Sequence, residues 1–183
     1  MNIVTGGRSI YGEAIGILVL ETTYPAIPGN VANASTYQFP VRYKVLEGIP
    51  SDWWCDEEGA SERRQEIFVQ KARELENEGV RAITTGCGFF AKYQQATSET
   101  LTVPVFTSPL LLVPMVSQMI GRAKRVGIIT AGENHLKGPF LENVGIDPSI
   151  PIAVDGMADK EEFTQTIVFE KKPEMDVPKV EAE

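Results

Sequence analysis

The sequence is poor in the residues that build metal centres and disulfide frameworks. Among its 183 residues are one histidine, His135, and two cysteines, Cys55 and Cys87. A structural zinc site needs about four nitrogen or sulfur ligands, usually in closely spaced pairs, and the sequence has no such cluster. Two cysteines are also too few for a disulfide framework in a chain long enough to build a core. We therefore expect free thiols and no metal site.

Long apolar runs and an excess of positive charge are missing as well. The longest early apolar run, Ile15–Leu20, is far short of the roughly 20 residues that a membrane-spanning helix needs. Lysine and arginine number 17 against 25 aspartate and glutamate residues, so the net charge is −8. Such a chain repels phosphate backbones and anionic lipid surfaces. The composition therefore disfavours nucleic-acid and membrane partners and, without a secretory signal pattern at the N-terminus, predicts a cytoplasmic protein.

Short apolar runs alternate with helical patterns along the chain. Strands and helices that alternate in this way form parallel sheets with right-handed crossovers, which predicts an α/β fold. The pattern at residues 41–46 predicts a strand with one exposed face, and the apolar start of residues 110–124 predicts a helix buried between two layers. We expect strands near residues 16–20, 41–46, 80–85, 103–107, 126–130 and 152–154, and helices near residues 61–78, 89–98, 110–124, 135–144 and 160–170.

Cys87 occupies the place where parallel sheets bind their ligands. It follows the strand predicted at residues 80–85, between Gly86 and Gly88, and ligand sites lie outside the carboxyl ends of such strands. Free backbone amides and the positive end of the next helix are expected to lower its thiol pKa and favour a thiolate. The amides of Gly88 and Phe89 can then face a bound carboxylate. The alternative, that Cys87 is a small core residue at a tight turn, stays open.

Four segments of the chain occur in the order GILVLETTYPAIPGNV, FPVRYKV, GVRAITTGCGFFAKYQ and RVGIITAG. In this order they resemble the successive blocks of the aspartate/glutamate/hydantoin racemase superfamily. The resemblance is strongest to an uncharacterised branch with a proline-rich first loop. It implies two similar flavodoxin-like α/β halves that face each other across a cleft, and we place the first half, which carries Cys87, at residues 1–109 and a partial second half at residues 110–183.

The same resemblance implies two cysteines, one from each half, that act without a cofactor on a carbon next to a carboxylate. Inverting such a centre takes a base on one face, an acid on the other and donors for the charge on the carboxylate. Cys87 matches the first cysteine of the family, and no cysteine matches the second. Cys55 lies between Asp52 and Asp56, whose charges raise a thiol pKa, so we interpret it as incidental. We therefore expect the second half to be incomplete, with at least one further strand–helix unit absent.

Two further segments match substrate-facing parts of the family, namely the proline-rich loop and the end of the strand at residues 126–130. A rigid surface loop and a helix cap are the structural alternatives for them. Trp53 and Trp54 are adjacent and cannot share one face, so we expect one to cover the cleft or a subunit contact and the other to pack inward. The predicted substrate-binding residues of the two segments are Pro28, Gly29, Asn30, Thr130, Ala131 and Gly132.

Three functions fit these residues. The first is a cofactor-independent isomerase that racemises or epimerises a small amino acid or a derivative, with Cys87 as acid or base. The second is a cysteine-dependent decarboxylase or cis–trans isomerase of small dicarboxylates, and the third is binding of a small carboxylate without catalysis. The apolar residues 110–119 also permit a homodimer.

Overall fold

The structure, a computed structural model, describes residue 3, residues 6–55 and residues 61–183. The side chains of Cys55 and Ser61 are not among the described groups. The interpretation of Cys55 as incidental depends on its side chain and on acidic residues such as Asp56. These lie outside the described part of the chain.

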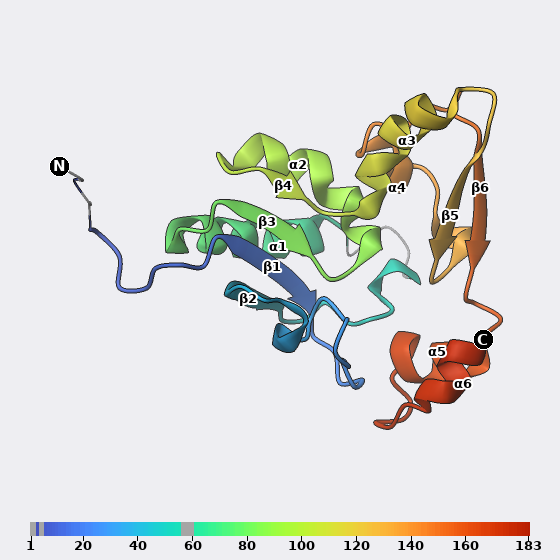
Figure 1. The fold of residues 1–183 in the computed structure, drawn as a ribbon, viewed down its shortest axis with the longest axis horizontal. Helices are drawn as coiled ribbons and strands as arrows, with labels where there is room; N and C mark the ends of the chain where they lie inside the picture. Colours follow the sequence, from blue (N-terminus) through green and yellow to red (C-terminus); the bar gives the residue numbers. More distant parts are fainter. Residues whose placement is uncertain (1–2, 4–5, 56–60) are drawn as a thin grey trace.

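The larger of two sheets has four strands and belongs to the first half of the chain. Their order is β2-β1-β3-β4, and every neighbouring pair is parallel (Figure 1). This is the order of the first four strands in a flavodoxin-like sheet. All four strands lie where the sequence predicts them, and they are β1 (Ile15–Leu20), β2 (Val41–Leu46), β3 (Ala82–Thr85) and β4 (Val105–Phe106).

A long helix, α1 (Ser61–Glu78), packs against β1, β2 and β3. Phe68, Ala72 and Leu75 are buried on one side of it, as its periodicity predicts. Gly79 ends the helix with φ +99°, a left-handed conformation that glycine adopts at little cost.

The helical segments between the strands are mostly short. The helix expected at residues 89–98 begins as a 3-10 helix, η4 (Gly88–Tyr93), and continues as α2 (Gln94–Thr100). Two further 3-10 turns lie in the connections around β2. They are η1 (Ala34–Thr36) and η2 (Trp53–Cys55).

The polar residues of β2 are paired with acidic residues instead of facing water. Arg42 donates hydrogen bonds to the carboxylates of Glu13 and Glu78, and Lys44 Nζ lies 2.7 Å from Glu78 Oε1. Glu78 belongs to α1, so these ion pairs tie the edge strand to the helix. The exposed face predicted for this strand therefore carries Val45 and not its cationic residues.

The second sheet has two parallel strands, and these confirm an α/β fold with parallel sheets in both halves. It has fewer strands than the first sheet. The domain boundary that we place between residues 109 and 110 falls within the turn η5 and stays a proposal. The elements of this half are η5 (Pro109–Leu112), α3 (Val113–Ile120), β5 (Val126–Thr130), η6 (Glu133–His135), α4 (Pro139–Glu142) and β6 (Ile152–Gly156).

The helix α3 does not lie between two layers. Val113 and Ser117 are buried on its inner side, but Met115 and Met119 are 52% and 75% exposed on its outer side. The expectation of a buried helix is therefore wrong. An apolar segment indicates that one side of a helix packs against the core. Whether a second layer covers its other side depends on the other elements of the fold.

The last part of the chain, residues 161–183, forms a small helical unit that we name the C-terminal module. Its centre is the buried carboxylate of Glu162, which accepts hydrogen bonds from Lys172, Thr166 and the Asp176 amide. The helix expected at residues 160–170 is interrupted by a π-helical turn. The module consists of α5 (Glu161–Phe163), η7 (Thr164–Val168) and α6 (Val177–Ala182).

Two polar contacts fasten the C-terminal module to loops of the first half. The Ser51 hydroxyl donates to the Val168 carbonyl over 2.6 Å, and the amide and hydroxyl of Thr23 each donate to the Glu170 carboxylate over 2.6 Å. Figure 1 shows the module beyond the arrowheads of β5 and β6, on the side where β1 also ends. The module therefore lies next to the carboxyl ends of both sheets.

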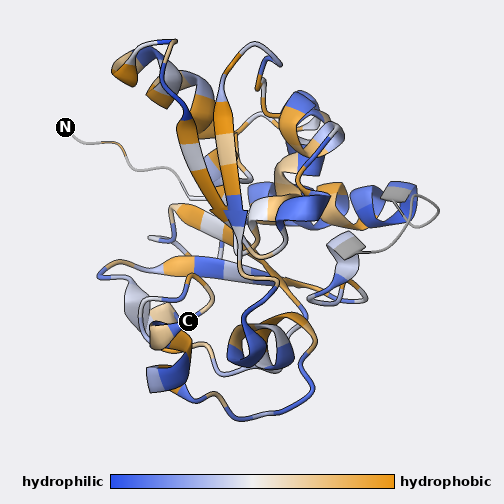
Figure 2. Cartoon of the chain, turned by 90° about the vertical axis from the view of Figure 1, so that its right-hand side faces the viewer, coloured by the Kyte–Doolittle hydropathy of each residue, from blue (hydrophilic) through white to orange (hydrophobic). Residues whose placement is uncertain are grey.

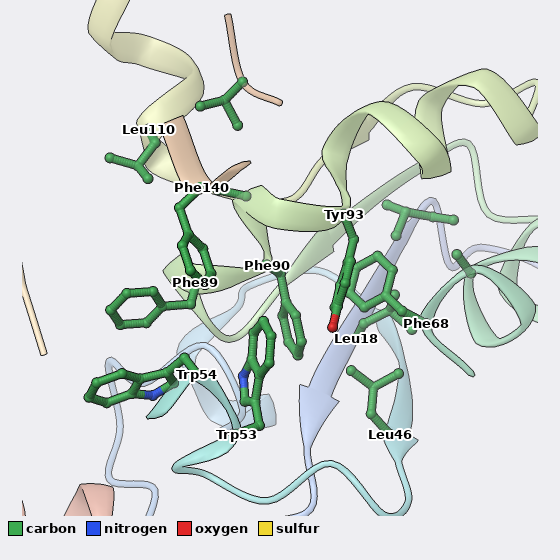
Figure 3. Packing of buried hydrophobic residues seen from close by; sticks show 14 of the residues in the cluster. Leu18, Leu46, Trp53, Trp54, Phe68, Phe89, Phe90, Tyr93, Leu110 and Phe140 are labelled. Atoms are coloured by element: carbon green, nitrogen blue, oxygen red, sulfur yellow. The ribbon is translucent and has the colours of Figure 1, made fainter. Parts of the chain in front are cut away.

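Seven aromatic residues join the two halves, and we name them the aromatic cluster (Figure 3). Trp53 stacks on Phe90 with ring centroids 5.2 Å apart, and Phe140 of α4 meets Phe89 of η4 edge-on at 5.3 Å. The second half therefore docks on the first through aromatic contacts. The members are Trp53, Trp54, Phe68, Phe89, Phe90, Tyr93 and Phe140.

Hydrophobic residues are concentrated along the strands, most visibly in β5 and β6 (Figure 2). The buried residues of both halves form one continuous core. Within the described ranges, no helix combines the length and the apolar character that crossing a membrane requires.

We predict that Glu162→Gln loosens the C-terminal module near neutral pH. The hydrogen bond from Lys172, together with that from the Asp176 amide, lowers the pKa of Glu162 from 4.5 to about 2. A carboxyl whose folded-state pKa is depressed contributes stability above its unfolded pKa, and this contribution is lost as the pH falls through about 2. Hydrogen exchange followed by mass spectrometry is therefore expected to be faster for residues 161–183 of the variant at neutral pH.

The difference in hydrogen exchange between the variant and the parent protein is expected to shrink as the pH falls toward the folded-state pKa of Glu162. Glu181→Gln is the matched control, because the Glu181 side chain of the same module is exposed. Equal exchange in Glu162→Gln and the parent protein at neutral pH would contradict the stabilising role of this carboxylate.

Candidate functional site

The carboxyl ends of β1, β3 and β5 surround one pocket of about 260 Å³. In a flavodoxin-like sheet the strand order reverses between β1 and β3, and ligands bind in the crevice at that point. Loops after both strands line this pocket, and η7 of the C-terminal module closes it from another side. Its polar or reactive side chains are Tyr24, Ser51, Cys87 and Thr130. We therefore treat it as the candidate active site.

Cys87 precedes η4 and contributes to the wall of this pocket. Burial raises the pKa of its thiol from 9.0 to about 11, although hydrogen bonds from the Phe89 and Phe90 amides act in the opposite direction. The expectation of a lowered thiol pKa is therefore wrong. The following segment is a short 3-10 helix and not an α-helix, and its amides do not outweigh the cost of moving a charged sulfur away from water.

Tyr24 is one of the pocket residues that sequence reasoning missed, and it carries a titratable group. Burial raises the pKa of its phenol, the nearby Cys87 and Glu170 raise it further, and hydrogen bonds with Asn30 and Thr22 oppose the shift. The phenol is therefore neutral near pH 7 and can donate a hydrogen bond into the pocket. The feature of the sequence that could have identified it is a tyrosine on the proline-rich loop, shortly after the first buried strand.

Trp54 forms an aromatic wall of the pocket together with Phe89. The two rings stack with centroids 4.5 Å apart and an interplanar angle of 11°, and His135 meets the Trp54 ring edge-on at 5.1 Å. Trp54 thus lines the pocket, and Trp53 packs inward. This agrees with the prediction that one of the two tryptophans covers the cleft or a subunit contact and the other packs inward.

The predicted site residues fall into two groups in the structure. Cys87, Gly88, Phe89, Thr130 and Ala131 line the pocket together. The other four, Pro28, Gly29, Asn30 and Gly132, do not line it. Their substrate contacts stay predictions.

Pro28, Gly29 and Asn30 fold back on their own loop. The Gly29 amide donates to Thr36 Oγ1 over 3.0 Å, and Asn30 Oδ1 accepts from the Ala32 amide over 2.8 Å. These hydrogen bonds are made within the loop, and none of the three residues lines the pocket. Asn30 still acts on the site indirectly, because its side chain is hydrogen-bonded to the Tyr24 phenol and lowers the pKa of that group.

Gly132 supports the aromatic wall and does not line the pocket. A Cβ atom at this position would lie 2.5 Å from the Trp54 ring. The ring is held between Phe89 and His135, so it has little room to move. The absence of a side chain at Gly132 therefore allows Trp54 to reach its place beside Cys87.

A second hollow of about 320 Å³ lies between η5, α3 and β5. It shares Gly88, Phe89, Ile129 and Thr130 with the first, but its remaining lining is almost entirely apolar and contains no thiol or phenol. Among the described residues, no group of three or more histidine, cysteine, aspartate or glutamate side chains could hold a metal ion. The chemistry that the described residues offer is therefore concentrated around Cys87 and Tyr24.

Comparison with known proteins finds relatives among dimethylsulfoniopropionate lyases. The chain is 30% identical over 137 residues to the dimethylsulfoniopropionate lyase of Durusdinium sp. clade D, a match that covers 74% of this chain and 45% of the relative. It is 26% identical over 139 residues to dimethylsulfoniopropionate lyase 7 of Emiliania huxleyi (strain CCMP1516), with 74% and 40% covered. The chain thus spans less than half the length of these curated relatives. No model of a known protein family matches the chain.

Two solved structures show weak overall likeness. A mutant of arylmalonate decarboxylase in a sulfate-associated form superposes with a TM-score of 0.49 and 17% identity, covering 80% of this chain and 63% of that one. An aspartate racemase homologue from Pyrococcus horikoshii OT3 gives 0.44 and 17%, covering 85% and 70%. Likenesses at this level carry no argument about function.

We predict that Gly132→Ala destabilises the protein by about 1–3 kcal/mol, because the added methyl group forces Trp54 off its stacked position. Gly127→Ala is the matched control, since Gly127 lies on β5 and a Cβ there meets nothing within 4 Å. Urea unfolding of both variants measures the difference. Equal losses of stability in the two variants would contradict the close packing of Gly132 on Trp54.

We also predict slow alkylation of Cys87 at neutral pH. A thiol with a pKa of about 11 is almost wholly protonated near pH 7, so its rate with iodoacetamide is expected to rise about tenfold per pH unit until the pH approaches that pKa. Mass spectrometry of the Cys55→Ser protein measures the rate at Cys87 alone. A rate that levels off below about pH 8 would show that burial does not control this thiol.

Proposed function

We propose that this chain carries the thiol side of the active site of a cofactor-independent enzyme. In it, Cys87 removes the proton from the carbon next to the carboxylate of a small substrate. The observation that carries the proposal is the position of Cys87 in a pocket at the switch point of the sheet, together with the Tyr24 phenol. Similarity to the dimethylsulfoniopropionate lyases supports it and makes dimethylsulfoniopropionate the first substrate to test.

This substrate fits the chemistry of a single cysteine. The ionised Cys87 takes a proton from the carbon next to the carboxylate, and the electron pair of that C–H bond forms a carbon–carbon double bond. The bond to the sulfonium sulfur breaks at the same time, and its electron pair stays on sulfur. The products are acrylate and neutral dimethyl sulfide, and the Cys87 thiol returns its proton to water. Unlike racemisation, this elimination needs no acid on the opposite face of the carbon.

A cationic substrate also fits the surroundings of the thiol. Tyr24, Trp54 and Phe89 place three aromatic rings around the pocket, and such rings attract a cation electrostatically. A sulfonium group bound beside Cys87 opposes the effect of burial, because a nearby positive charge lowers a thiol pKa. The Tyr24 and Thr130 hydroxyls, with the amide predicted at Gly88, supply donors for the carboxylate, whereas the Phe89 amide is already hydrogen-bonded to Cys87.

Racemisation of a small amino acid or a derivative, which the sequence resemblance implies, is the second candidate. It requires an acid that faces Cys87 across the substrate. Among the described pocket residues, the Tyr24 phenol is the group most able to give a proton, since Ser51 already donates its proton to the Val168 carbonyl. Decarboxylation, cis–trans isomerisation of dicarboxylates and binding without catalysis are the remaining alternatives.

The homodimer and the cytoplasmic location expected from the sequence stay predictions. Leu112, Met115 and Met119 form an exposed apolar side of η5 and α3. This exposure supports the homodimer, because exposed apolar side chains that lie together commonly mark protein contacts.

The decisive experiment measures dimethyl sulfide released from dimethylsulfoniopropionate by gas chromatography. Cys87→Ser is expected to abolish release, and Tyr24→Phe to slow it about 10- to 100-fold, because the phenol orients the substrate or stabilises its charge. Tyr43→Phe is the matched control, since the Tyr43 hydroxyl donates to the Val31 carbonyl over 2.9 Å and does not line the pocket. It is expected to keep the parent rate.

A second readout separates the candidates. In heavy water, proton NMR detects deuterium at the carbon next to the carboxylate of dimethylsulfoniopropionate or of an amino acid. Release of dimethyl sulfide supports the lyase, and exchange with loss of optical rotation supports the racemase. Neither release nor exchange with any tested carboxylate would overturn the proposal that Cys87 abstracts a proton.

A further inference from the structure

Trp53 carries a buried hydrogen-bond donor without a conventional partner. The residue is 2% exposed, and its indole Nε1 has no hydrogen-bond acceptor among the described residues. Burying an unpaired donor costs free energy, and folded proteins keep few such groups. Nε1 of Trp53 therefore calls for an explanation.

The ring cannot turn to find another acceptor. It stacks on Phe90 at 5.2 Å and on Tyr93 at 5.4 Å, with interplanar angles of 17° and 22°. Phe140 packs against it at 6.3 Å, and Arg64 donates to the Trp53 carbonyl over 3.1 Å. The orientation of the indole N–H is thus fixed by packing on several sides.

The Trp53 ring packs against the segment that directly follows Cys87. In Figure 3 the Trp53 nitrogen is on the ring edge turned toward Trp54 and away from Tyr93. Trp54 lines the same pocket as Cys87, and Phe90, on which Trp53 stacks, donates its amide to the Cys87 carbonyl over 3.1 Å. Together with the Phe89 and Phe90 amides, the Trp53 side chain is one of the donors that lower the pKa of Cys87.

The strength of this contact depends on the charge of the sulfur. A neutral thiol is a weak acceptor, which explains why Nε1 lacks a conventional partner, whereas a thiolate is charged and accepts a much stronger hydrogen bond. Since the N–H is already oriented, no rearrangement is needed when the charge forms. The contact therefore stabilises the anion more than the neutral group.

We propose that Trp53 is a positioning residue whose indole N–H donates a hydrogen bond to the ionised sulfur of Cys87. It is a third donor beside the two backbone amides. The inference deepens the proposed function, because that function requires Cys87 in its ionised form. It does not depend on the identity of the substrate.

The titratable groups that the structure describes near the sulfur do not favour its ionised form. Tyr24, on the loop after β1, is the titratable residue that interacts with Cys87 from another element of the described structure, and Glu170 of the C-terminal module interacts with Tyr24 in turn. Both are neutral or negative, so neither favours a thiolate. Ser51 donates its proton to the Val168 carbonyl. Among the described residues, this leaves Trp53 as the side-chain donor that lowers the pKa of Cys87.

The test compares thiolate formation with and without this N–H. In a Cys55→Ser background, the rate of Cys87 alkylation by iodoacetamide is measured from neutral to alkaline pH for the parent, for Trp53→Phe and for a protein with benzothienylalanine at position 53. Benzothienylalanine has the size and shape of tryptophan but no N–H, so it preserves the packing. Both changes are expected to slow alkylation about tenfold at a fixed pH below the thiol pKa, equivalent to about one unit in that pKa.

Phe68→Leu is the matched control for loss of packing. Phe68 belongs to the aromatic cluster and contacts Phe90 at 4.8 Å, but it carries no donor. This variant is expected to lower the midpoint of thermal unfolding and to keep the parent pH profile. If Trp53 had only a structural role, Trp53→Phe would likewise lower the unfolding midpoint and keep the parent pH profile of alkylation. An alkylation rate that is unchanged with benzothienylalanine would overturn the inference.

The outcome is independent of that of the proposed function. A parent protein that releases no dimethyl sulfide and exchanges no proton, but shows slower alkylation without the indole N–H, would overturn the proposed function and support the inference. A parent protein that releases dimethyl sulfide, together with an unchanged pH profile of alkylation in both Trp53 proteins, would support the proposed function and overturn the inference.

Discussion

The stack of Trp54 on Phe89 is the contact on which the rest of the site depends. It brings the connection after β2 against the turn after β3, so that two loops far apart in the sequence share one wall. Phe140 then packs edge-on against Phe89 and attaches the second half to the same point. Aromatic pairs contribute both buried area and a preferred geometry. The aromatic cluster therefore stabilises the fold and fixes where the Cys87 thiol lies.

Cys87 is held in a balance between burial and hydrogen bonding. Burial disfavours its charge and dominates, while donors from Phe89, Phe90 and Trp53 favour it. A partly buried thiol with a raised pKa reacts slowly with adventitious reagents, because the thiolate is the reactive form. A positive group on a substrate shifts the balance toward the anion. In the proposed lyase, the surroundings that keep the thiol protonated therefore favour a carboxylate that also carries a positive group.

The C-terminal module places a third wall on the pocket and ties it to the first half. Glu162 organises the module internally, and Glu170 and Ser51 connect it to loops that follow β1 and β2. Ile167 and Val168 of η7 then reach the pocket that contains Cys87. The site is therefore assembled from parts of the chain that are separated by more than half of its length, as a comparison of Tyr24 with Val168 shows.

The sequence by itself determined the order of strands and helices and the place of Cys87 after β3. Apolar runs and helical periodicity are local, and the carboxyl end of a parallel strand follows directly from them. Only the tertiary structure decided that Tyr24 lines the pocket, that Pro28, Gly29 and Asn30 do not, and that Gly132 makes room for Trp54. It also decided the direction in which the pKa of Cys87 moves, because burial is the sum of contacts from segments distant in sequence, whereas only two of the three donors that oppose it, the Phe89 and Phe90 amides, are close by in the chain.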